Sequence, residues 1–243
     1  MQHERLTVGA VVPARDEAGN IGAVVGELLA LRTPGGEPVI DDVVVCDNGS
    51  TDGTAQRARA AGARVVVEPT PGYGQACLTA LAALRPVDVV LFVDGDQSSA
   101  TAEAPDLLRG IAAGAELVIG SRVPGRREPG ALSPPQIAGN RVASVLIRLL
   151  WGRRVTDLGP FRAIRADALR RLDMRDRAYG WTVEMQIKAI QVGLRIVEQP
   201  VSSRRRRFGR SKVGGTVRGV IGASAGILGT IVRLRLLEGW ERP

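Results

Sequence analysis

Aromatic side chains and histidine are scarce in this chain of 243 residues. Aromatic residues make up 3% of it, and its single histidine is His3, next to the N-terminus. Proteins that bind single-stranded nucleic acid stack the bases on aromatic rings, so we do not expect nucleic acid as a partner. Because the one histidine lies in this terminus, His-based catalytic triads and His-rich metal sites are excluded.

The sequence also lacks a cysteine framework and a long hydrophobic run. Cys46 and Cys77 lie far apart without a CxxC motif, which predicts buried thiols of a reducing compartment. The longest apolar candidate, residues 219–232, has 14 residues, whereas a membrane span needs roughly 18 to 20. The first apolar run, residues 8–12, is too short for a signal peptide. We therefore predict a cytoplasmic protein, which at most contacts the inner face of the cell membrane.

Positive charge is concentrated near the C-terminus. The net charge is +8, and residues 201–243 hold ten Lys or Arg against two Asp or Glu, so the first 200 residues are neutral overall. A basic segment of this kind can bind nucleic acid, an anionic membrane or a phosphorylated substrate. Because the rest of the chain is neutral and poor in aromatics, the last two are favoured.

Apolar, β-branched runs alternate with helical patterns along the first half of the chain. Such alternation predicts an α/β fold, with parallel strands joined by crossover helices. The expected strands are residues 6–13, 40–46, 64–67, 88–94 and 116–120, and the expected helices are residues 18–32, 53–62, 74–85 and 103–113.

Each expected strand is followed by a polar, charged or glycine-rich loop. Because parallel strands end at the same edge of a sheet, and ligands bind at that edge, these loops predict the active site. In chain order they are PARDE (13–17), CDNGSTDG (46–53), EPTPGYG (68–74), DGDQ (94–97) and GSR (120–122).

After residue 120 the alternation becomes less regular. We divide the chain into a catalytic domain, residues 1–202, and a C-terminal part, residues 203–243, made of a basic loop and an apolar, amphipathic helix that faces a membrane or a partner. Between residue 120 and the C-terminal part, the expected elements are a loop rich in Pro, Gly and Arg (123–135), a helix (138–150), the segment TDLGPFRAIR (156–165), a helix (182–192) and a last strand (194–201).

The DGDQ motif places Asp94 and Asp96 on either side of Gly95, directly after a buried strand. One interpretation is a polar turn, since Asp and Gly are common turn residues. The other is a metal site, because carboxylates bind Mg²⁺ or Mn²⁺ together with the phosphate oxygens of a nucleotide diphosphate. Gly95 would let the backbone pass close to a ligand. We favour the metal site.

Two further loops carry candidate nucleotide contacts. Asp47 directly follows a strand, where its carboxylate can accept hydrogen bonds from a base or a ribose. In PARDE, Pro13 stiffens the end of the first strand, and Glu17 lies in the first turn of a helix, where a carboxylate is favoured in any case. Read alone, each loop is also compatible with a well-capped turn.

Taken together and in order, these motifs resemble the family 2 glycosyltransferases with the GT-A fold. The most similar subgroup is the polyprenyl (dolichyl) phosphate sugar synthases, and TDLGPFRAIR, GWTVEMQIKA and RRRFGRSK fit that subgroup as well. The resemblance thus covers nearly the whole chain. It implies a Rossmann-like, mixed but mainly parallel sheet flanked by helices.

The resemblance also implies residue roles and a Mg²⁺ or Mn²⁺ cofactor. Asp96 would be the principal metal ligand, with Asp94 and Gln97 as further ligands, although the family often has its glutamine two residues after the second aspartate and not directly after it. Arg122 would face the phosphates or the acceptor. The nucleotide site would be lined by Pro13, Ala14, Arg15, Glu17, Asp47, Asp94 and Gly95.

Glu184 has three alternative roles. Relatives that glycosylate a hydroxyl group often use a helical carboxylate as general base. An acceptor phosphate is already ionised at pH 7 and needs no base. Glu184 would then position the sugar or hold a loop.

The basic segment RRRRFGRSK, residues 204–212, can bind a phosphate, because arginine donates two parallel hydrogen bonds to phosphate oxygens. We assign the acceptor phosphate to Arg122, Arg207, Arg210, Ser211 and Lys212; a solvated basic run is the alternative.

After the basic segment, glycines recur at 215, 219, 222, 226 and 229, on one face of a helix. This pattern predicts close packing, against a membrane, a partner helix in an oligomer, or the catalytic domain.

We therefore expect a metal-dependent, inverting transfer of a hexose from a GDP- or UDP-linked sugar to a polyprenyl phosphate. The alternative within enzymes is a soluble glycosyltransferase that acts on a small phosphorylated or hydroxyl acceptor. A non-catalytic nucleotide-binding scaffold is a third possibility, which the acidic pair disfavours.

Overall fold

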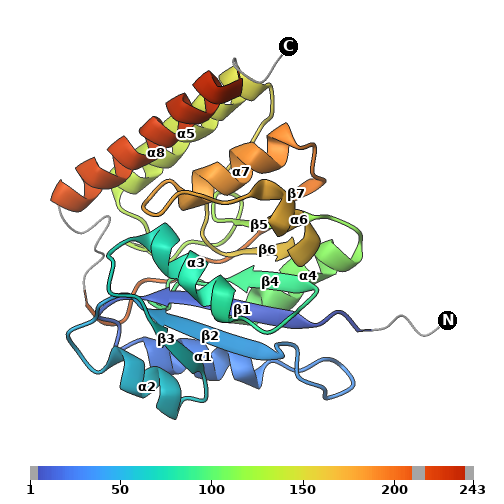
Figure 1. The fold of residues 1–243 in the computed structure, drawn as a ribbon, viewed down its shortest axis with the longest axis vertical. Coiled ribbons are helices and arrows are strands. Elements are labelled where there is room, and N and C mark those ends of the chain that lie inside the picture. The colour runs from blue at the N-terminus through green and yellow to red at the C-terminus, as the bar shows by residue number, and fades with distance from the viewer. Residues whose placement is uncertain (1–4, 210–216, 239–243) are drawn as a thin grey trace.

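The structure, a computed structural model, describes residues 5–209 and 217–238. Within these residues seven strands form one sheet in the order β3-β2-β1-β4-β6-β5-β7 (Figure 1). All neighbouring strands are parallel except β6, which is antiparallel to both β4 and β5. The strands are β1 (Val8–Ala14), β2 (Asp42–Asp47), β3 (Arg64–Val67), β4 (Val89–Phe92), β5 (Leu117–Ser121), β6 (Arg162–Arg165) and β7 (Ile196–Pro200).

Helices flank this sheet, so the predicted α/β fold with a mixed, mainly parallel sheet is confirmed. Each expected strand and helix is present, within a few residues of its expected bounds. Strand β6 and helix α6 were not predicted from the sequence. The helices are α1 (Ile21–Ala30), α2 (Thr54–Ala60), α3 (Tyr73–Ala83), the 3₁₀ turn η1 (Thr101–Glu103), α4 (Ala104–Ala112), α5 (Pro134–Trp151), α6 (Ala166–Leu172), α7 (Trp181–Gln191) and α8 (Val217–Glu238).

The sheet is buried on both faces, as its apolar strands require. Side chains alternate along each strand: Val43 and Val45 of β2 join one core cluster, whereas Val44 and Cys46 join the other. Helices α1 and α4 cover the first face, and α3, α6 and α7 cover the second. Cys46 and Cys77 are both buried free thiols, as predicted.

The antiparallel strand β6 decides which loops meet. Residues 156–161 lead into β6, and an antiparallel strand begins at the edge where its parallel neighbours end. The TDLGPF segment therefore lies beside the end of β5, where the backbone N–H of Gly120 donates to the carbonyl oxygen of Phe161 at 2.8 Å. A segment far along the chain thus reaches the edge predicted to hold the active site.

Helices α5 and α8 lie side by side at one end of the molecule (Figure 1), and both pack on α7 through a third apolar cluster that includes Ile147, Val183 and Ile231. Two glycines of the predicted stripe face Tyr179: a Cβ added to Gly222 or Gly226 would lie 3.7 or 3.3 Å from its side chain. The stripe therefore packs in part on the chain's own loop. Among the described residues, no helix is both long and apolar enough to span a bilayer.

Candidate active site

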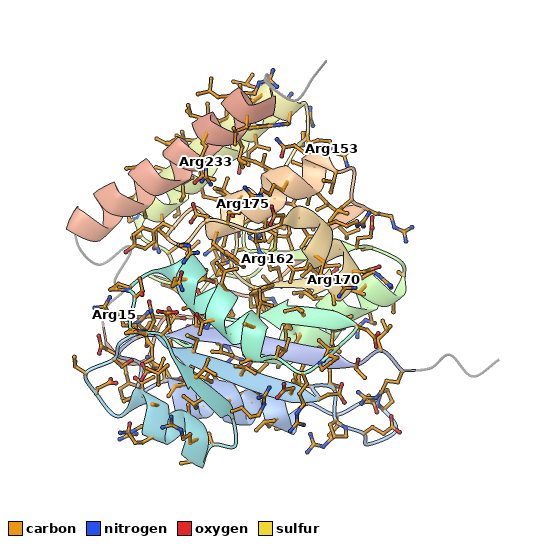
Figure 2. The ribbon with its side chains drawn as sticks, viewed as in Figure 1. Arg15, Arg153, Arg162, Arg170, Arg175 and Arg233 are labelled. Carbon is orange, nitrogen blue, oxygen red and sulfur yellow. The ribbon has the colours of Figure 1, made fainter. Side chains whose placement is uncertain are left out.

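The loops after β1 and β2 are locked together at the edge of the sheet. The register pairs Ala14 with Asp47, so the two loops start side by side. The carboxylate of Asp16 accepts the backbone N–H of Thr51 at 2.8 Å, and the Glu17 N–H donates to the Thr54 hydroxyl at 2.8 Å. Pro13, Ala14, Glu17 and Asp47 are all buried there, whereas Arg15 is exposed at the rim of the molecule (Figure 2).

The loop after β3 is held by Asn48, which the sequence interpretation had not singled out. Its side-chain amide donates to the carbonyl oxygens of Glu68 and Thr70 at 2.9 and 2.7 Å, and its oxygen accepts the Gly72 N–H at 2.8 Å. The Glu68 carboxylate accepts hydrogen bonds from the side chains of Thr79 and Gln75 and from the Thr70 N–H. These bonds lower the pKa of Glu68 to about 2.

The glycines of PGYG permit the close approach of a second loop, residues 173–180. Gly72 has φ +155°, and an added Cβ would lie 2.1 Å from the Arg177 carbonyl oxygen; at Gly74 the corresponding distance, to the Asp176 carbonyl oxygen, is 2.0 Å. The N–H of Gly74 donates to the Ala178 carbonyl at 3.1 Å. No side chain larger than hydrogen fits at Gly72 or Gly74 unless the loop moves.

Between these glycines, Tyr73 begins α3 and reaches the acidic pair. Its hydroxyl donates to Oδ1 of Asp94 at 2.8 Å. Burial and the Asp94 charge raise the pKa of Tyr73 well above its usual value, so the phenol remains a donor. Burial and the neighbouring Asp96 carboxylate raise the pKa of Asp94. The only sequence signal for Tyr73 was an aromatic residue within a glycine-rich loop.

Asp96 contacts an arginine from the C-terminal part of the chain. Its Oδ1 accepts the Ser98 N–H at 2.9 Å, and its Oδ2 accepts Nη2 of Arg206 at 2.7 Å. Nη1 of the same guanidinium donates to Glu17 at 2.8 Å. Arg206 therefore links the DGDQ and PARDE motifs.

The segment around Arg206 crosses the ends of the strands. Arg204 pairs with Glu27 of α1 at 3.2 Å, and Phe208 lies against Gly19, where an added Cβ would be 2.7 Å away. The sequence analysis assigned Arg207 to the acceptor phosphate; in the structure this residue is exposed. Its other choices in this segment, Arg210, Ser211 and Lys212, lie outside the described residues.

Gly95 and Gln97 contact the first β/α unit. A Cβ added to Gly95 would lie 3.2 Å from the side chains of Ala14 and Ile21, so this glycine lets the DGDQ loop approach β1 and α1. Gln97 is buried with φ +59°, and its amide donates to Glu27 at 3.4 Å. Roles for either residue toward a ligand stay predictions.

Arg122, at the end of β5, is held by Asp157. Asp157 is 1% exposed and accepts three hydrogen bonds from Arg122: from the backbone N–H at 2.8 Å, from Nε at 2.7 Å and from Nη2 at 2.7 Å. The sequence interpretation missed Asp157, whose one signal is an acidic residue within the otherwise uncharged stretch TDLGPF.

The Asp157 loop is itself anchored by side chains from other elements. Asn140 of α5 donates to the Thr156 carbonyl at 3.1 Å and accepts the Leu158 N–H at 2.8 Å. Glu198 of β7 accepts the N–H and the hydroxyl of Thr156, both at 2.8 Å. These anchors fix the direction of the Arg122 guanidinium.

Arg162, which lies in the middle of the molecule (Figure 2), supports the same loop through hydrogen bonds. It is fully buried, and burial lowers the pKa of its guanidinium to about 10. Its guanidinium donates hydrogen bonds to backbone carbonyls: Gly159 at 3.0 Å, Thr182 at 2.9 Å and Leu158 at 3.2 Å. Arg162 therefore ties the loop before β6 to the start of α7.

Glu184 is buried in α7 and is surrounded by donors. Its carboxylate accepts the backbone N–H groups of Arg175 and Asp176, the latter at 2.7 Å, and pairs with Lys188 at 2.9 Å. Thr230 of α8 donates to the Asp176 side chain at 3.0 Å, on the same loop. These contacts match the alternative in which Glu184 holds a loop, here residues 173–180; a base role stays a prediction.

The acidic pair is suited to a divalent cation that is shared with phosphates. Among the described residues there is no group of three or more His, Cys, Asp or Glu that could enclose a metal. Mg²⁺ typically takes one or two carboxylates and completes its shell with water and substrate phosphates. Burial and, after it, repulsion from Asp96 raise the pKa of Asp94, and a cation beside the two carboxylates would offset both effects. Two carboxylates therefore suffice for a site of this kind.

A mixed sheet with acidic and arginine-bearing loops at the carboxyl ends of its strands is the architecture of GT-A glycosyltransferases. Residues 10–173 match the family model described as glycosyl transferase family 2. An uncharacterized glycosyltransferase of Mycobacterium tuberculosis is 37% identical over 217 residues, which cover 88% of this chain and 93% of that one. The chain therefore belongs to glycosyl transferase family 2, and the protein is an enzyme.

Two further similar proteins have more specific names. The undecaprenyl-phosphate mannosyltransferase of Micrococcus luteus is 32% identical over 252 residues, covering 97% of each chain. The crystal structure of glucosyl-3-phosphoglycerate synthase from Mycobacterium tuberculosis with Mn²⁺, UDP and glucosyl-3-phosphoglycerate has a TM-score of 0.75 at 24% identity, covering 94% of this chain and 79% of that one. The structural similarity covers nearly the whole chain, which confirms the predicted GT-A fold.

Proposed function

We propose that the enzyme transfers a hexose from a nucleotide-sugar to a polyprenyl phosphate, with inversion at the anomeric carbon. The observation that carries the proposal is the Asp94–Asp96 pair at the edge of the sheet, with Arg206 bound to it and Arg122 held beside it. The name of the similar Micrococcus luteus protein supports a polyprenyl phosphate as acceptor.

On the donor side, the ends of β1 and β2 hold the nucleotide. Pro13, Ala14 and Asp47 form the wall of that site, and Asp47 accepts hydrogen bonds from the base or ribose. Asp96, with Asp94, would hold Mg²⁺ or Mn²⁺. The metal would neutralise the charge of the leaving nucleoside diphosphate. The Tyr73 hydroxyl fixes Asp94 for this role.

On the acceptor side, Arg122 binds the phosphate. Asp157 accepts hydrogen bonds from Nε and Nη2 of its guanidinium, which leaves Nη1 to donate to a phosphate oxygen. The acceptor oxygen is ionised at neutral pH and attacks the anomeric carbon from the face opposite the leaving diphosphate. No general base is needed, and Glu184 then serves to hold residues 173–180.

The direct test is a transfer assay with UDP-glucose and GDP-mannose as donors and undecaprenyl phosphate as acceptor. We expect sugar on the lipid phosphate with one of these donors, in the presence of Mg²⁺ or Mn²⁺, and loss of the product with EDTA. Transfer that proceeds only to non-lipid acceptors would contradict the proposed acceptor, whereas full activity in EDTA would contradict the proposed metal.

A second candidate is transfer to a small phosphorylated or hydroxyl acceptor. It is favoured by the structural likeness to glucosyl-3-phosphoglycerate synthase, which was crystallised with its glucosylated product. In this case 3-phosphoglycerate replaces the lipid in the assay. With a hydroxyl acceptor, the pH dependence of kcat/KM would report a basic group of the free enzyme, for which Glu184 is the candidate.

Arg206 is expected to compete with the metal for Asp96. Its Nη2 lies 2.7 Å from Oδ2 of Asp96, so this oxygen cannot at once bind a cation on the same side. In Arg206→Gln we expect Mn²⁺ to bind about threefold or more tightly without nucleotide, as measured by electron paramagnetic resonance of free Mn²⁺. Arg205→Gln, an exposed neighbour, is the control. Unchanged or weaker Mn²⁺ affinity in Arg206→Gln would contradict competition.

We also propose a cytoplasmic location, with the C-terminal part, residues 203–243, turned toward the inner face of the membrane. Val232, Leu236 and Leu237 of α8 are more than half exposed, beside the exposed guanidinium of Arg235. Apolar and cationic side chains on one helix suit an anionic lipid surface. The same exposed residues also suit a second copy of the chain, as in the oligomer predicted from the sequence.

A further inference from the structure

The loop at residues 173–180 lies between helix α8 and the first turn of α3. On the α3 side, the backbone N–H of Gly74 donates to the carbonyl oxygen of Ala178 at 3.1 Å. The N–H of Gln75 donates to the carbonyl oxygen of Arg177 at 2.9 Å. The first N–H groups of a helix have no acceptor within the helix itself. The loop therefore supplies these acceptors and fixes the direction in which α3 starts.

On the α8 side, the carboxylate of Asp176 links the loop to the helix. Its Oδ1 accepts the backbone N–H of Ala178 at 2.8 Å, and its Oδ2 accepts the hydroxyl of Thr230 at 3.0 Å. Thr230 is 4% exposed and the Asp176 side chain 12% exposed, so water is a poor replacement for either partner. The Thr230 hydroxyl thus orients the carboxylate that holds Ala178, whose own carbonyl accepts a hydrogen bond from α3.

The contact between Thr230 and the loop is close. A Cβ added to Gly180 would lie 2.1 Å from the Thr230 hydroxyl oxygen and 2.2 Å from Oδ2 of Asp176. Glu184 of α7 also holds the loop, through the N–H groups of Arg175 and Asp176. These two residues precede the pair that contacts α3, so the Asp176 side chain is what extends the support to that pair.

Tyr73 transmits the position of α3 to the acidic pair. It is the first residue of α3, and its hydroxyl donates to Oδ1 of Asp94 at 2.8 Å. The loop binds the two residues that directly follow Tyr73, so a shift of the loop would move the tyrosine with the first turn of the helix. Hydrogen bonds weaken steeply when their angle becomes unfavourable. The orientation of Asp94 therefore depends on the loop.

We infer that Thr230 is a positioning residue for the metal site. Through Asp176, residues 173–180 and the first turn of α3, it fixes Tyr73, and Tyr73 fixes Asp94 for a divalent cation. The inference rests on the proposed function, because it takes the acidic pair as the metal site. It gives α8 a role in metal binding that is separate from contact with a membrane or a partner.

The first readout needs no metal. Thr230→Val keeps the shape of the side chain and removes its hydroxyl. In this variant we expect the amide protons of Gly74 and Gln75 to exchange with deuterium about threefold or more faster, because the loop that accepts them is released. NMR-detected hydrogen exchange measures this. Ser224→Ala, which removes an exposed hydroxyl of the same helix, is the matched control and should leave both rates unchanged.

The second readout is the Kd for Mn²⁺ alone, from electron paramagnetic resonance of the free ion. Thr230→Val and Tyr73→Phe should each raise this Kd about threefold or more, because a less ordered Asp94 must be ordered when the cation binds. Thr230→Ser keeps the hydroxyl and should bind Mn²⁺ as the unaltered enzyme does. In the double variant, Thr230→Val should add nothing to the effect of Tyr73→Phe, since both act through the same hydrogen bond.

Asp176→Ala breaks the link from the loop side and provides a second variant with the same expected pattern. All variants are compared at a temperature below their melting transitions. Equal Mn²⁺ affinity in Thr230→Val and Ser224→Ala would overturn the inference. Effects of Thr230→Val and Tyr73→Phe that add in the double variant would overturn it as well, because Thr230 would then act by another route.

The two proposals can fail separately. Mn²⁺ affinity that depends on Thr230 through Tyr73, without transfer from any nucleotide-sugar, would support the positioning role and contradict the proposed reaction. Metal-dependent transfer to undecaprenyl phosphate, with Mn²⁺ affinity unchanged in Thr230→Val, would support the proposed reaction and overturn the positioning role.

Discussion

Asp96→Asn is expected to lose at least about 99% of the sugar transfer while the protein stays folded. The substitution removes the negative charge that would hold the divalent cation against the diphosphate of the donor. A metal ion contributes several kcal/mol of charge stabilisation to such a reaction, and about 1.4 kcal/mol corresponds to a factor of ten in rate. The side chain is 18% exposed, and asparagine can still accept the Ser98 N–H bond, so the fold should tolerate it.

The measurement is kcat/KM for the donor at saturating Mg²⁺ or Mn²⁺, together with the melting temperature. Asp106→Asn is a suitable control, because this carboxylate lies on α4 and pairs only locally with Arg109; it should keep the activity of the unaltered enzyme. Near-normal turnover by Asp96→Asn would contradict a metal-binding role for this residue. A large drop in melting temperature would instead assign Asp96 a structural role.

Asp157→Asn is expected to affect both stability and binding of the acceptor. Arg122 is 23% exposed and depends on Asp157 for three hydrogen bonds. Removing one charge of a largely buried pair typically costs about 3 kcal/mol. For a chain of this size, the loss corresponds to a decrease of about 6–12 °C in the melting temperature.

The second effect separates positioning from support of the fold. If Asp157 aims the guanidinium at the acceptor phosphate, Asp157→Asn should raise KM for the acceptor about tenfold or more, at a temperature where the variant is folded, and leave KM for the donor nearly unchanged. Asp167→Asn breaks an exposed pair with Arg165 and should change stability by less than about 1 kcal/mol. Equal KM values in Asp157→Asn and the unaltered enzyme would leave Asp157 with a structural role only.

Much of this molecule follows from local patterns in the sequence. Apolar β-branched runs and helical patterns alternate, and their bounds agree with those of β1 to β5 and α1 to α4 within a few residues. Parallel strands that end at one edge necessarily bring their following loops together, which is why the acidic pair and Arg122 could be assigned to one edge without a structure. The glycine-rich PGYG loop could be assigned to the same edge, but the close approach of residues 173–180 that its glycines permit was not predicted.

The contacts that complete the site were not predictable in this way, because their partners are distant in sequence. Arg206 lies 110 residues from Asp96, and Tyr73 and Asp157 lie 21 and 35 residues from Asp94 and Arg122. Four consecutive arginines at 204–207 are equivalent by composition. The path of the backbone across the ends of the strands decides that Arg206 reaches Asp96, while Arg207 remains exposed.

The sequence by itself determined the order of the elements, the burial of the sheet and the edge that carries the acidic and basic loops, because these depend on short-range periodicity. Only the tertiary structure decided that β6 runs antiparallel and brings Asp157 to Arg122, that the C-terminal part returns Arg206 to Asp96, and that residues 173–180 link α8 to α3. Those features depend on how distant surfaces pack, and packing is a property of the folded chain as a whole.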